Sequence, residues 1–365
     1  MSTIESDHPT KKIKIAVVGT GWWATTAHIP ALKANPRAEL VLVDKSPAAL
    51  KAAAEKYAVD AAFTSIPEAV KAHPDLKGAI VAVPHAAHFE VGKEVLNSRL
   101  HLLMEKPMTL HAADAKMLVD LAESKGLQIL MGYTFPYLDP LQEARKRIDD
   151  GLLGDIEYVT CSMTSLTIEF YRGKPENYDP VMKYVVTGPD ASTYSDPHIA
   201  GGGQAQLQIT HSVAMMFYLA PGLRAHTVSA FMNTLDTKVD VVDAFAVRMN
   251  NGAVATVGSS GNIGPGDAGI VEVHLHGSKG RLLVDAISGL MYMRLHNGKE
   301  ERIAPTYPAY PGNEPSKRFI EIIADGAKNE FPGRDNGLYT VELLEAAYRS
   351  ADQEGMPVKV ASLYA

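Results

Sequence analysis

A short apolar run that ends in a glycine turn does most to constrain how this chain can fold. Residues 13–24 read Ile-Lys-Ile-Ala-Val-Val-Gly-Thr-Gly-Trp-Trp-Ala, which places Gly19, Gly21 and Ala24 in a Gly-x-Gly-x-x-Ala pattern. This pattern predicts a strand, a tight turn and the start of a helix. Gly19 permits the turn, Gly21 lets a pyrophosphate approach the backbone, and Ala24 lets helix and strand pack closely. The N–H groups of the first helical turn then point at the anion.

An acidic residue at the end of the next apolar run supports dinucleotide binding. Asp44 closes Glu-Leu-Val-Leu-Val-Asp at residues 39–44. A carboxylate there accepts hydrogen bonds from ribose hydroxyls and repels a 2′-phosphate. The sequence therefore predicts NAD as the cofactor, with NADP as the alternative because Lys45 and Ser46 follow at once and can accommodate a phosphate. Contacts with the nucleotide are expected from Gly19, Gly21, Trp22, Trp23, Ala24, Asp44 and Lys45.

Length and composition limit the classes of protein and partner. A chain of 365 residues suits two domains. The net charge of −7 is spread along the chain without a basic block, which argues against nucleic acid as a partner. No apolar run approaches the roughly eighteen residues that span a bilayer, so no membrane partner is expected. The single cysteine, Cys161, suggests a reducing compartment and predicts a cytoplasmic protein. The polar residues 1–12 are predicted to form a disordered tail.

The first third of the chain alternates short β-branched runs with helical stretches. Strands are predicted at 13–18, 39–43, 79–83, 101–104 and 128–131, and helices near 24–34, 47–57, 66–72, 87–98 and 111–125. Such alternation implies right-handed crossovers and a parallel sheet with helices on both faces. We therefore predict an α/β, doubly wound Rossmann domain over residues 13–134.

Beyond residue 135 the pattern is that of an α+β domain on a largely antiparallel sheet. Period-two runs predict strands at 156–162, 241–249, 253–259, 271–276 and 281–285, with hairpin signals at Asn251-Gly252 and Asn297-Gly298. Helices are expected at 316–328 and 336–353. We expect residues 135–365 to bind the substrate and to mediate a homodimer or homotetramer, because one sheet face lacks an evident helical layer. The apolar residues assigned to that face are Val241, Ala253, Val257, Val271 and Leu283.

Two further segments follow strands of the predicted parallel sheet, on the side where its ligands bind. Lys106 lies in Met-Glu-Lys-Pro-Met, just after the strand at 101–104, and Pro107 biases it away from helix. The alternative interpretation of Lys106 is a solvated loop residue paired with Glu105. The other segment is Pro-His-Ala-Ala-His at residues 84–88, and the alternative interpretation of His88 is that it only starts the next helix. Cofactor contacts are expected from Pro84, His85, His88, Glu105 and Lys106.

A glycine run followed by an apolar helix supplies a second set of polar candidates. Gly201-Gly202-Gly203 leads into a helix on which Gln204, Gln208 and His211 share one stripe at α-helical spacing. Two amides and an imidazole on such a stripe suit a hydroxylated ligand, and an imidazole with an ordinary pKa near 6.5 exchanges a proton near neutral pH. The long aromatic stretch 167–200, which includes Tyr194, suits a substrate rim. No cluster has the spacing of metal ligands, so no metal is predicted.

These motifs together resemble the Gfo/Idh/MocA oxidoreductases, named for glucose–fructose oxidoreductase and inositol dehydrogenase. The resemblance extends over nearly the whole chain. It is carried by the glycine turn with His28-Ile29-Pro30-Ala31-Leu32, Ser65-Ile66-Pro67-Glu68, Val83-Pro84 with His88, Glu105-Lys106-Pro107, Gly132-Tyr133, Asp139-Pro140, Gly151-Leu152-Leu153-Gly154, the 201–211 segment and the helix around 342–350. We expect His28 itself to be structural.

The resemblance implies an NAD(P)-dependent dehydrogenase of sugars, cyclitols or their derivatives, with an open-faced sheet in its second domain. It implies Lys106 and His211 as catalytic residues and a substrate site formed by Lys106, Tyr194, Gln204, Gln208 and His211. Family members commonly carry acids where this chain has Leu207 and Ala214, which leaves the general base open. The alternatives are a glycosidase or lyase that recycles NAD, an epimerase-like member, or a catalytically silent regulator that senses a sugar or nucleotide.

Overall fold

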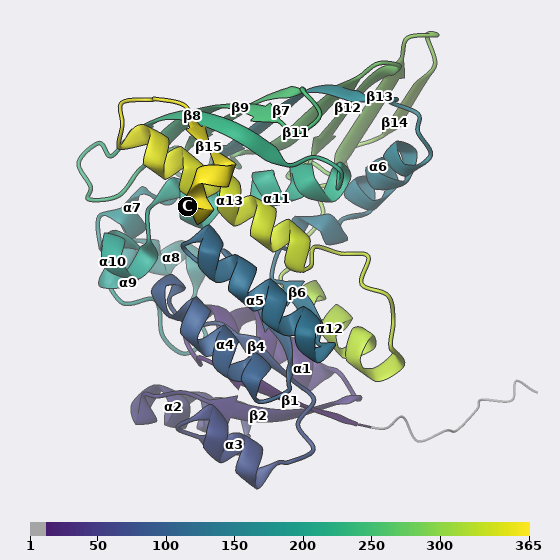
Figure 1. Ribbon diagram of the computed structural model, residues 1–365. Helices are drawn as coiled ribbons and strands as arrows, with labels where there is room; N and C mark the ends of the chain where they lie inside the picture. Colours follow the sequence, from purple (N-terminus) through teal and green to yellow (C-terminus); the bar gives the residue numbers. More distant parts are fainter. Residues whose placement is uncertain (1–11) are drawn as a thin grey trace, which may run out of the picture.

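The computed structural model describes residues 12–365, so the predicted tail lies outside the described residues except for Lys12. Two sheets dominate the structure (Figure 1). A parallel sheet from the first part of the chain lies at the bottom of that view, and a larger sheet lies at the top. The predicted fold class, a Rossmann-like parallel sheet followed by a largely antiparallel sheet domain, is confirmed.

The first sheet has the strand order β3-β2-β1-β4-β5-β6, and all its pairs are parallel. The chain order reverses beside β1, which creates the switch point where such sheets bind ligands. Its strands are β1 (Ile13–Val18), β2 (Ala38–Val43), β3 (Ala62–Phe63), β4 (Gly78–Val81), β5 (His101–Met104) and β6 (Ile129–Met131). The sequence missed only the two-residue strand β3.

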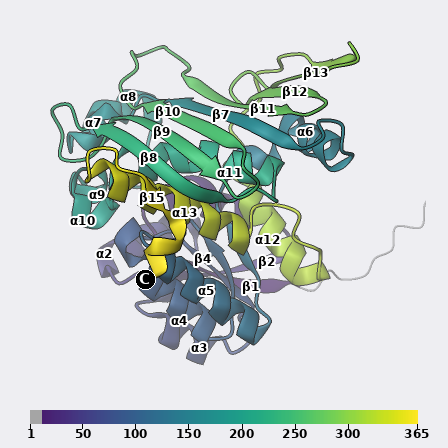
Figure 2. The same cartoon turned by 45° about the horizontal axis from the view of Figure 1, so that its top comes forward.

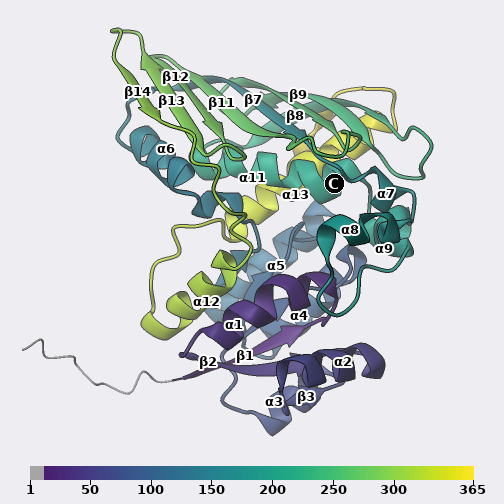
Figure 3. The ribbon, with the colours of Figure 1, turned by 180° about the vertical axis from the view of Figure 1, so that it is seen from behind.

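Helices cover both faces of this sheet, as predicted. One face carries α3 (Ile66–Ala72), α4 (His88–Asn97) and α5 (Ala112–Lys125). The other carries the π-helical turn η1 (Ala24–His28), α1 (Ile29–Ala34), α2 (Pro47–Tyr57) and α12 (Glu314–Asp325). Helix α12 follows the second sheet in the chain but packs beside α1, where Phe319 and Ile320 are fully buried (Figure 3).

The second sheet has nine strands in the order β14-β13-β12-β11-β7-β10-β9-β8-β15. Only the central pair β7–β10 is parallel. Its strands are β7 (Ile156–Thr164), β8 (Ala225–Asn233), β9 (Val242–Met249), β10 (Val254–Ser260), β11 (Ile270–Gly277), β12 (Gly280–Asp285), β13 (Leu290–Leu295), β14 (Glu300–Ile303) and β15 (Val358–Lys359).

A layer of three helices covers one face of the second sheet (Figure 2). These are α6 (Asp139–Asp149), α11 (Thr210–Leu219) and α13 (Arg334–Ala351). Most of the residues that the sequence assigned to the uncovered sheet face lie on the other face. Val257 and Val271 point at the helices and are buried, as are Val241 and Ala253, and only Leu283 lies on the open face. The exposed apolar side chains of the open face are Phe231, Val242, Val254 and Ile270.

Short helices connect β7 to the layer beneath the sheet and form the predicted rim. They are α7 (Ile168–Tyr171), η4 (Pro175–Tyr178), α8 (Asp179–Met182), α9 (Ser192–Ser195) and α10 (Pro197–Ala200). The remaining turns are η2 (His85–Ala87), η3 (Phe135–Tyr137), η5 (Ala205–Ile209) and η6 (Val360–Tyr364). Together the rim and η5 bring the second part of the chain over the carboxyl ends of β1, β4 and β5.

Candidate active site

A cavity of about 700 Å³ lies where the glycine turn, the loops after β4 and β5, the rim and η5 meet. Its walls combine most of the residues that the sequence singled out. Those that line it are Gly21, Trp22, Trp23, Asp44, Pro84, His85, His88, Glu105, Lys106, Tyr194, Gln208 and His211. The structure therefore joins the predicted nucleotide and substrate residues in one cavity.

The glycine turn has the room that a pyrophosphate needs. Gly19 has φ +89°, and a Cβ there would collide with the carbonyl of Ala82, so this turn requires glycine. Gly21 borders the cavity, and a Cβ added to it would meet no protein atom within 4 Å. The residues present thus fit a dinucleotide whose phosphates lie against Gly21.

Asp44 holds the glycine turn in place as well as bordering the cavity. One carboxylate oxygen accepts hydrogen bonds from the Thr20 N–H at 2.7 Å and from the Thr20 hydroxyl at 2.8 Å. The other accepts from the Ser46 N–H at 2.8 Å. Each carboxylate oxygen can accept more than one bond, so Asp44 is still able to receive a ribose hydroxyl.

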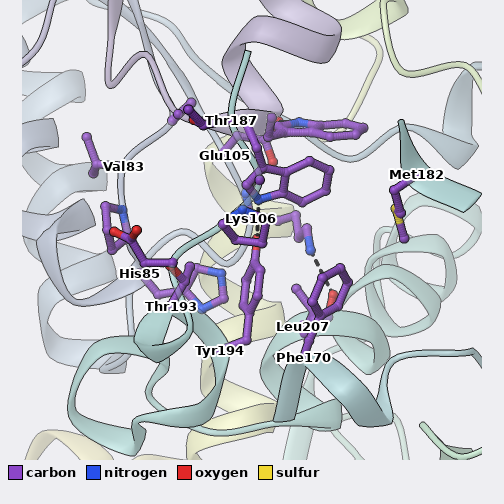
Figure 4. Close-up of a pocket in the computed structure, with 18 of the residues that line it drawn as sticks. Val83, His85, Glu105, Lys106, Phe170, Met182, Thr187, Thr193, Tyr194 and Leu207 are labelled. Carbon is purple, nitrogen blue, oxygen red and sulfur yellow. Dashed lines mark hydrogen bonds between the residues drawn. The ribbon is translucent and has the colours of Figure 1, made fainter. Parts of the chain in front are cut away.

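Lys106 extends from the end of β5 into the cavity. Its Nζ donates a hydrogen bond of 2.7 Å to the backbone carbonyl of Leu207 (Figure 4). Burial lowers the pKa of Lys106 to about 8, against the opposing charge of Glu105. The amine is therefore protonated at neutral pH yet close to its titration point.

The carboxylate of Glu105, next to Lys106, is already hydrogen-bonded to other groups of the protein. One oxygen of Glu105 accepts from Trp23 Nε1 and from His28 Nε2, both at 3.0 Å, and the other accepts from the Lys106 N–H at 3.1 Å. Burial by itself raises the pKa of Glu105, but the hydrogen bond and charge of His28 and the charge of Lys106 outweigh it and lower the pKa. Glu105 is thus an ionised group of the wall.

A π-helical turn changes which polar residues of the glycine-rich segment reach the cavity. Residues 205–209 form η5 before α11 begins, and the wider turn breaks the stripe that α-helical spacing predicts. Gln208 and His211 line the cavity, whereas Gln204 is fully buried outside it. The Gln204 amide bonds Thr167, Tyr171 and Ser259 instead. The structure therefore does not place Gln204 where it can bind a substrate.

His211 lies against aromatic rings and carries no charge near neutral pH. Its imidazole packs edge-to-face on Tyr133 and Phe135, with ring centroids 5.9 and 5.5 Å apart. Burial, and secondarily the charge of Lys106, lower its pKa well below the ordinary value. Within residues 12–365 its buried Nδ1 has no hydrogen-bond partner. Nε2 is therefore the nitrogen left to meet a ligand at the cavity wall.

The side of the cavity that the rim forms is largely aromatic. Trp22 packs on Trp23, Phe170 and Tyr184, and its Nε1 donates a hydrogen bond of 3.0 Å to the Tyr194 hydroxyl. Figure 4 shows Tyr194 and Phe170 among the residues that line the cavity with Lys106, and the two rings pack together with centroids 5.4 Å apart. This arrangement supports the expectation that Tyr194 contacts a ligand, and it adds ring faces on which a sugar ring can pack.

Three other predicted residues lie off the cavity wall, and several wall residues were missed. Ala24 is fully buried, Gly19 shapes the turn from behind, and Lys45 points to solvent. His85 and His88 line the wall, but their ring nitrogens bond the carbonyls of Ala200, Pro107 and Val83. The sequence did not predict the wall residues Phe135 and Tyr310, and it gave Phe170, Thr187 and Met182 only as part of the 167–200 stretch.

Within residues 12–365, no group of three or more His, Cys, Asp or Glu side chains is placed to hold a metal ion. None of the helices formed by these residues is both long and apolar enough to cross a membrane.

Comparison with known proteins identifies the family. A family model described as oxidoreductase family, NAD-binding Rossmann fold, matches residues 13–133. A second, the GFO/IDH/MocA C-terminal domain, matches residues 141–283. The chain belongs to the Gfo/Idh/MocA oxidoreductase family. The resemblance predicted from the motifs is confirmed, and the parallel sheet is the NAD-binding Rossmann domain of this Gfo/Idh/MocA protein.

Curated relatives of this Gfo/Idh/MocA chain include sugar-modifying enzymes. A dTDP-3,4-didehydro-2,6-dideoxy-alpha-D-glucose 3-reductase from Streptomyces violaceoruber is 30% identical over 42% of this chain and 45% of the reductase. The chain thus spans about half the length of that relative. A D-xylose 1-dehydrogenase (NADP(+)) from Hypocrea jecorina is 27% identical over 74% of this chain and 72% of the enzyme.

Solved structures share the fold over the whole chain. Levoglucosan dehydrogenase in complex with NADH and L-sorbose superposes with a TM-score of 0.78 at 19% identity, covering 96% of this chain and 99% of that one. An inositol dehydrogenase homolog from Azotobacter vinelandii, complexed with NAD+, gives a TM-score of 0.78 at 18% identity and covers 96% and 97%. At these identities the likeness establishes the fold alone.

Proposed function

We propose that this protein is an NAD-dependent dehydrogenase that moves a hydride between a secondary alcohol carbon of a sugar or cyclitol and the nicotinamide. The observation that carries the proposal is the meeting of Lys106 and His211 in the wall of the cavity that the glycine turn opens into. Named relatives that act on xylose and on a dTDP-linked deoxysugar support the substrate class.

The nicotinamide supplies the hydride chemistry when bound. Lys106, protonated at neutral pH, donates a hydrogen bond to the reacting oxygen of the substrate. This bond stabilises the negative charge that develops on the oxygen as the hydroxyl proton leaves. To do so, its Nζ exchanges the Leu207 carbonyl for the substrate oxygen. The neutral imidazole of His211 accepts the proton, and Gln208 binds a neighbouring hydroxyl because its amide does not titrate.

The experiment is a panel of sugars and cyclitols assayed with NAD by nicotinamide absorbance. Net reduction of NAD with one member supports the dehydrogenase. Product formation without net reduction indicates a hydrolase, lyase or epimerase that recycles the cofactor. Binding of NAD and sugar without product indicates a silent regulator, and either result overturns the proposal.

We further propose a cytoplasmic homodimer or homotetramer formed through the open face of the second sheet. Phe231 is 66% exposed and Val254 is 50% exposed, and with Val242 and Ile270 they lie on the open face, on strands β8, β10, β9 and β11. A sheet face that leaves large apolar side chains exposed favours closed, symmetric association. The cytoplasmic assignment is supported by the single buried cysteine, Cys161.

A further inference from the structure

A buried chain of hydrogen bonds runs from the start of α12 to the peptide of Lys106. The Ser316 hydroxyl lies 2.8 Å from Nδ1 of His28, and Nε2 of His28 lies 3.0 Å from a Glu105 oxygen. The second Glu105 oxygen accepts the Lys106 N–H at 3.1 Å. Ser316 and His28 have no exposed surface, and Glu105 is 6% exposed. The chain therefore links α12 to the reacting lysine through groups that are almost wholly removed from solvent.

The ionised carboxylate fixes the direction of the bond between His28 and Glu105. A carboxylate only accepts hydrogen bonds, so His28 carries a proton on Nε2 and donates a hydrogen bond to Glu105. The Ser316 hydroxyl pairs with Nδ1 on the other side of the ring, where it can serve as donor or acceptor. Ser316 thus holds the imidazole ring in the orientation that lets Nε2 reach Glu105.

Glu105 is also tied to the nucleotide side of the cavity. The oxygen that accepts from His28 accepts a second bond from Trp23 Nε1, and Trp23 belongs to the glycine fingerprint. Gly132 leaves the space that the carboxylate fills, because a Cβ there would collide with it. Glu105 is therefore the point at which the glycine turn, α12 and the lysine loop are joined.

We propose that His28 is a positioning residue for Lys106: anchored by Ser316, it holds the Glu105 carboxylate under the lysine peptide and joins that peptide to the glycine turn through Trp23. His28 does not line the cavity, so its effect is exerted through Glu105. Since the reacting role of Lys106 belongs to the proposed function, this inference rests on it.

The proposal predicts an electrostatic effect on the amine as well as a geometric one. The charge of Glu105 raises the pKa of Lys106 against the larger effect of burial. The other titratable groups that interact with Lys106 are His85, His88 and His211. A histidine side chain is neutral or positive, so none of the three can replace the negative charge of Glu105. If Glu105 loses its main hydrogen-bond donor, His28, its carboxylate is no longer fixed beside Lys106. The negative charge then stabilises the ammonium form of Lys106 less, and the pKa of Lys106 falls.

The test compares His28→Ala, His28→Gln and Ser316→Ala. Glutamine places an amide nitrogen near the position of imidazole Nε2 and restores the donor to Glu105. His101→Ala, at the opposite end of β5, is the matched control. The measurements are kcat and KM, NAD affinity by calorimetry, thermal stability, and an NMR titration of the Lys106 ε-methylene, assigned by its loss in Lys106→Met.

We expect His28→Ala to lower kcat at least roughly tenfold with KM and NAD affinity nearly unchanged, since the loss is one of positioning. The Lys106 titration moves down by roughly one pH unit. His28→Gln recovers most of both effects, and Ser316→Ala shows a smaller change in the same direction, which carries the test if His28→Ala does not fold.

An unmoved Lys106 titration in both His28→Ala and Ser316→Ala overturns the proposal. So does a His28→Gln variant that regains wild-type stability without regaining kcat, because His28 then acts only through packing. If the wild type turns over no substrate, the proposed function fails, while the lysine titration still decides the role of His28.

Discussion

The acid Asp243 offers a quantitative test of how the second sheet is held on its helices. Asp243 lies on β9, faces the helical layer and is only 3% exposed. Within residues 12–365 neither of its carboxyl oxygens has a hydrogen-bond partner. Burial, and secondarily the charge of Asp240, raise its pKa to about 9. The Asp240 carboxylate accepts from the Gly203 and Ala205 N–H groups and from the Tyr348 hydroxyl.

The raised pKa means that folding takes up a proton at neutral pH. An unfolded aspartate titrates near 3.9, so the folded chain binds more protons than the unfolded chain between about pH 4 and pH 9. The free energy of unfolding therefore falls as pH rises through this range. The slope is at most about 1.4 kcal/mol per pH unit, which amounts to about 4 kcal/mol at pH 7.

Asp243→Asn removes the ionisable group and places an amide donor beside Asp240. We expect the variant to unfold at higher urea concentration than wild type, with an advantage that grows from about pH 5 to about pH 8. Equilibrium urea unfolding at both values measures it, with the exposed Asp352→Asn as control. An advantage that is absent, or equal at the two pH values, would show that Asp243 is not held protonated in the fold.

The other predictions concern the cofactor, the proton path and assembly. Calorimetry should show tighter binding of NAD than of NADP, because Asp44 borders the cavity while Lys45 points to solvent; tighter NADP binding contradicts this. His211→Ala should lower turnover by about two to four orders of magnitude, whereas Gln208→Ala should mainly raise KM. Kinetics across pH tests both, and the reverse pattern would assign the proton transfer elsewhere. Phe231→Glu should convert the wild-type oligomer to a monomer in light scattering; a monomeric wild type refutes the assembly.

The architecture was predictable because it depends on periodicity. The alternation of apolar runs and helices fixes a parallel sheet, and period-two runs with hairpin signals fix an antiparallel one. Which face of a strand is covered was not predictable, because shifting the assignment by one residue exchanges the two faces. Val257 was assigned to the open face, yet it faces the helices, while Val254 on the same strand is the apolar residue that lies on the open face.

The candidate site was predictable where one motif carries one function. Gly21, Asp44 and Lys106 lie at strand ends, so the sheet topology alone brings them to one edge. Gln204 shows the limit of this reasoning, since the π-helical turn at 205–209 adds a residue that α-helical spacing does not count. Tyr310 shows a second limit: it reaches the cavity from a loop far along the chain, and its local sequence carries no signal.

The most direct test of the proposed chemistry is the turnover of Lys106→Met, measured by nicotinamide absorbance beside its NAD affinity. Methionine keeps much of the volume of the side chain and removes only the amine at the cavity wall. We predict that turnover is abolished while NAD affinity stays within a few fold of wild type, because Gly21 and Asp44 still hold the nucleotide. A variant that retains about a tenth of wild-type turnover would contradict the assignment, since losing a group that stabilises the reacting oxygen costs roughly a hundredfold or more.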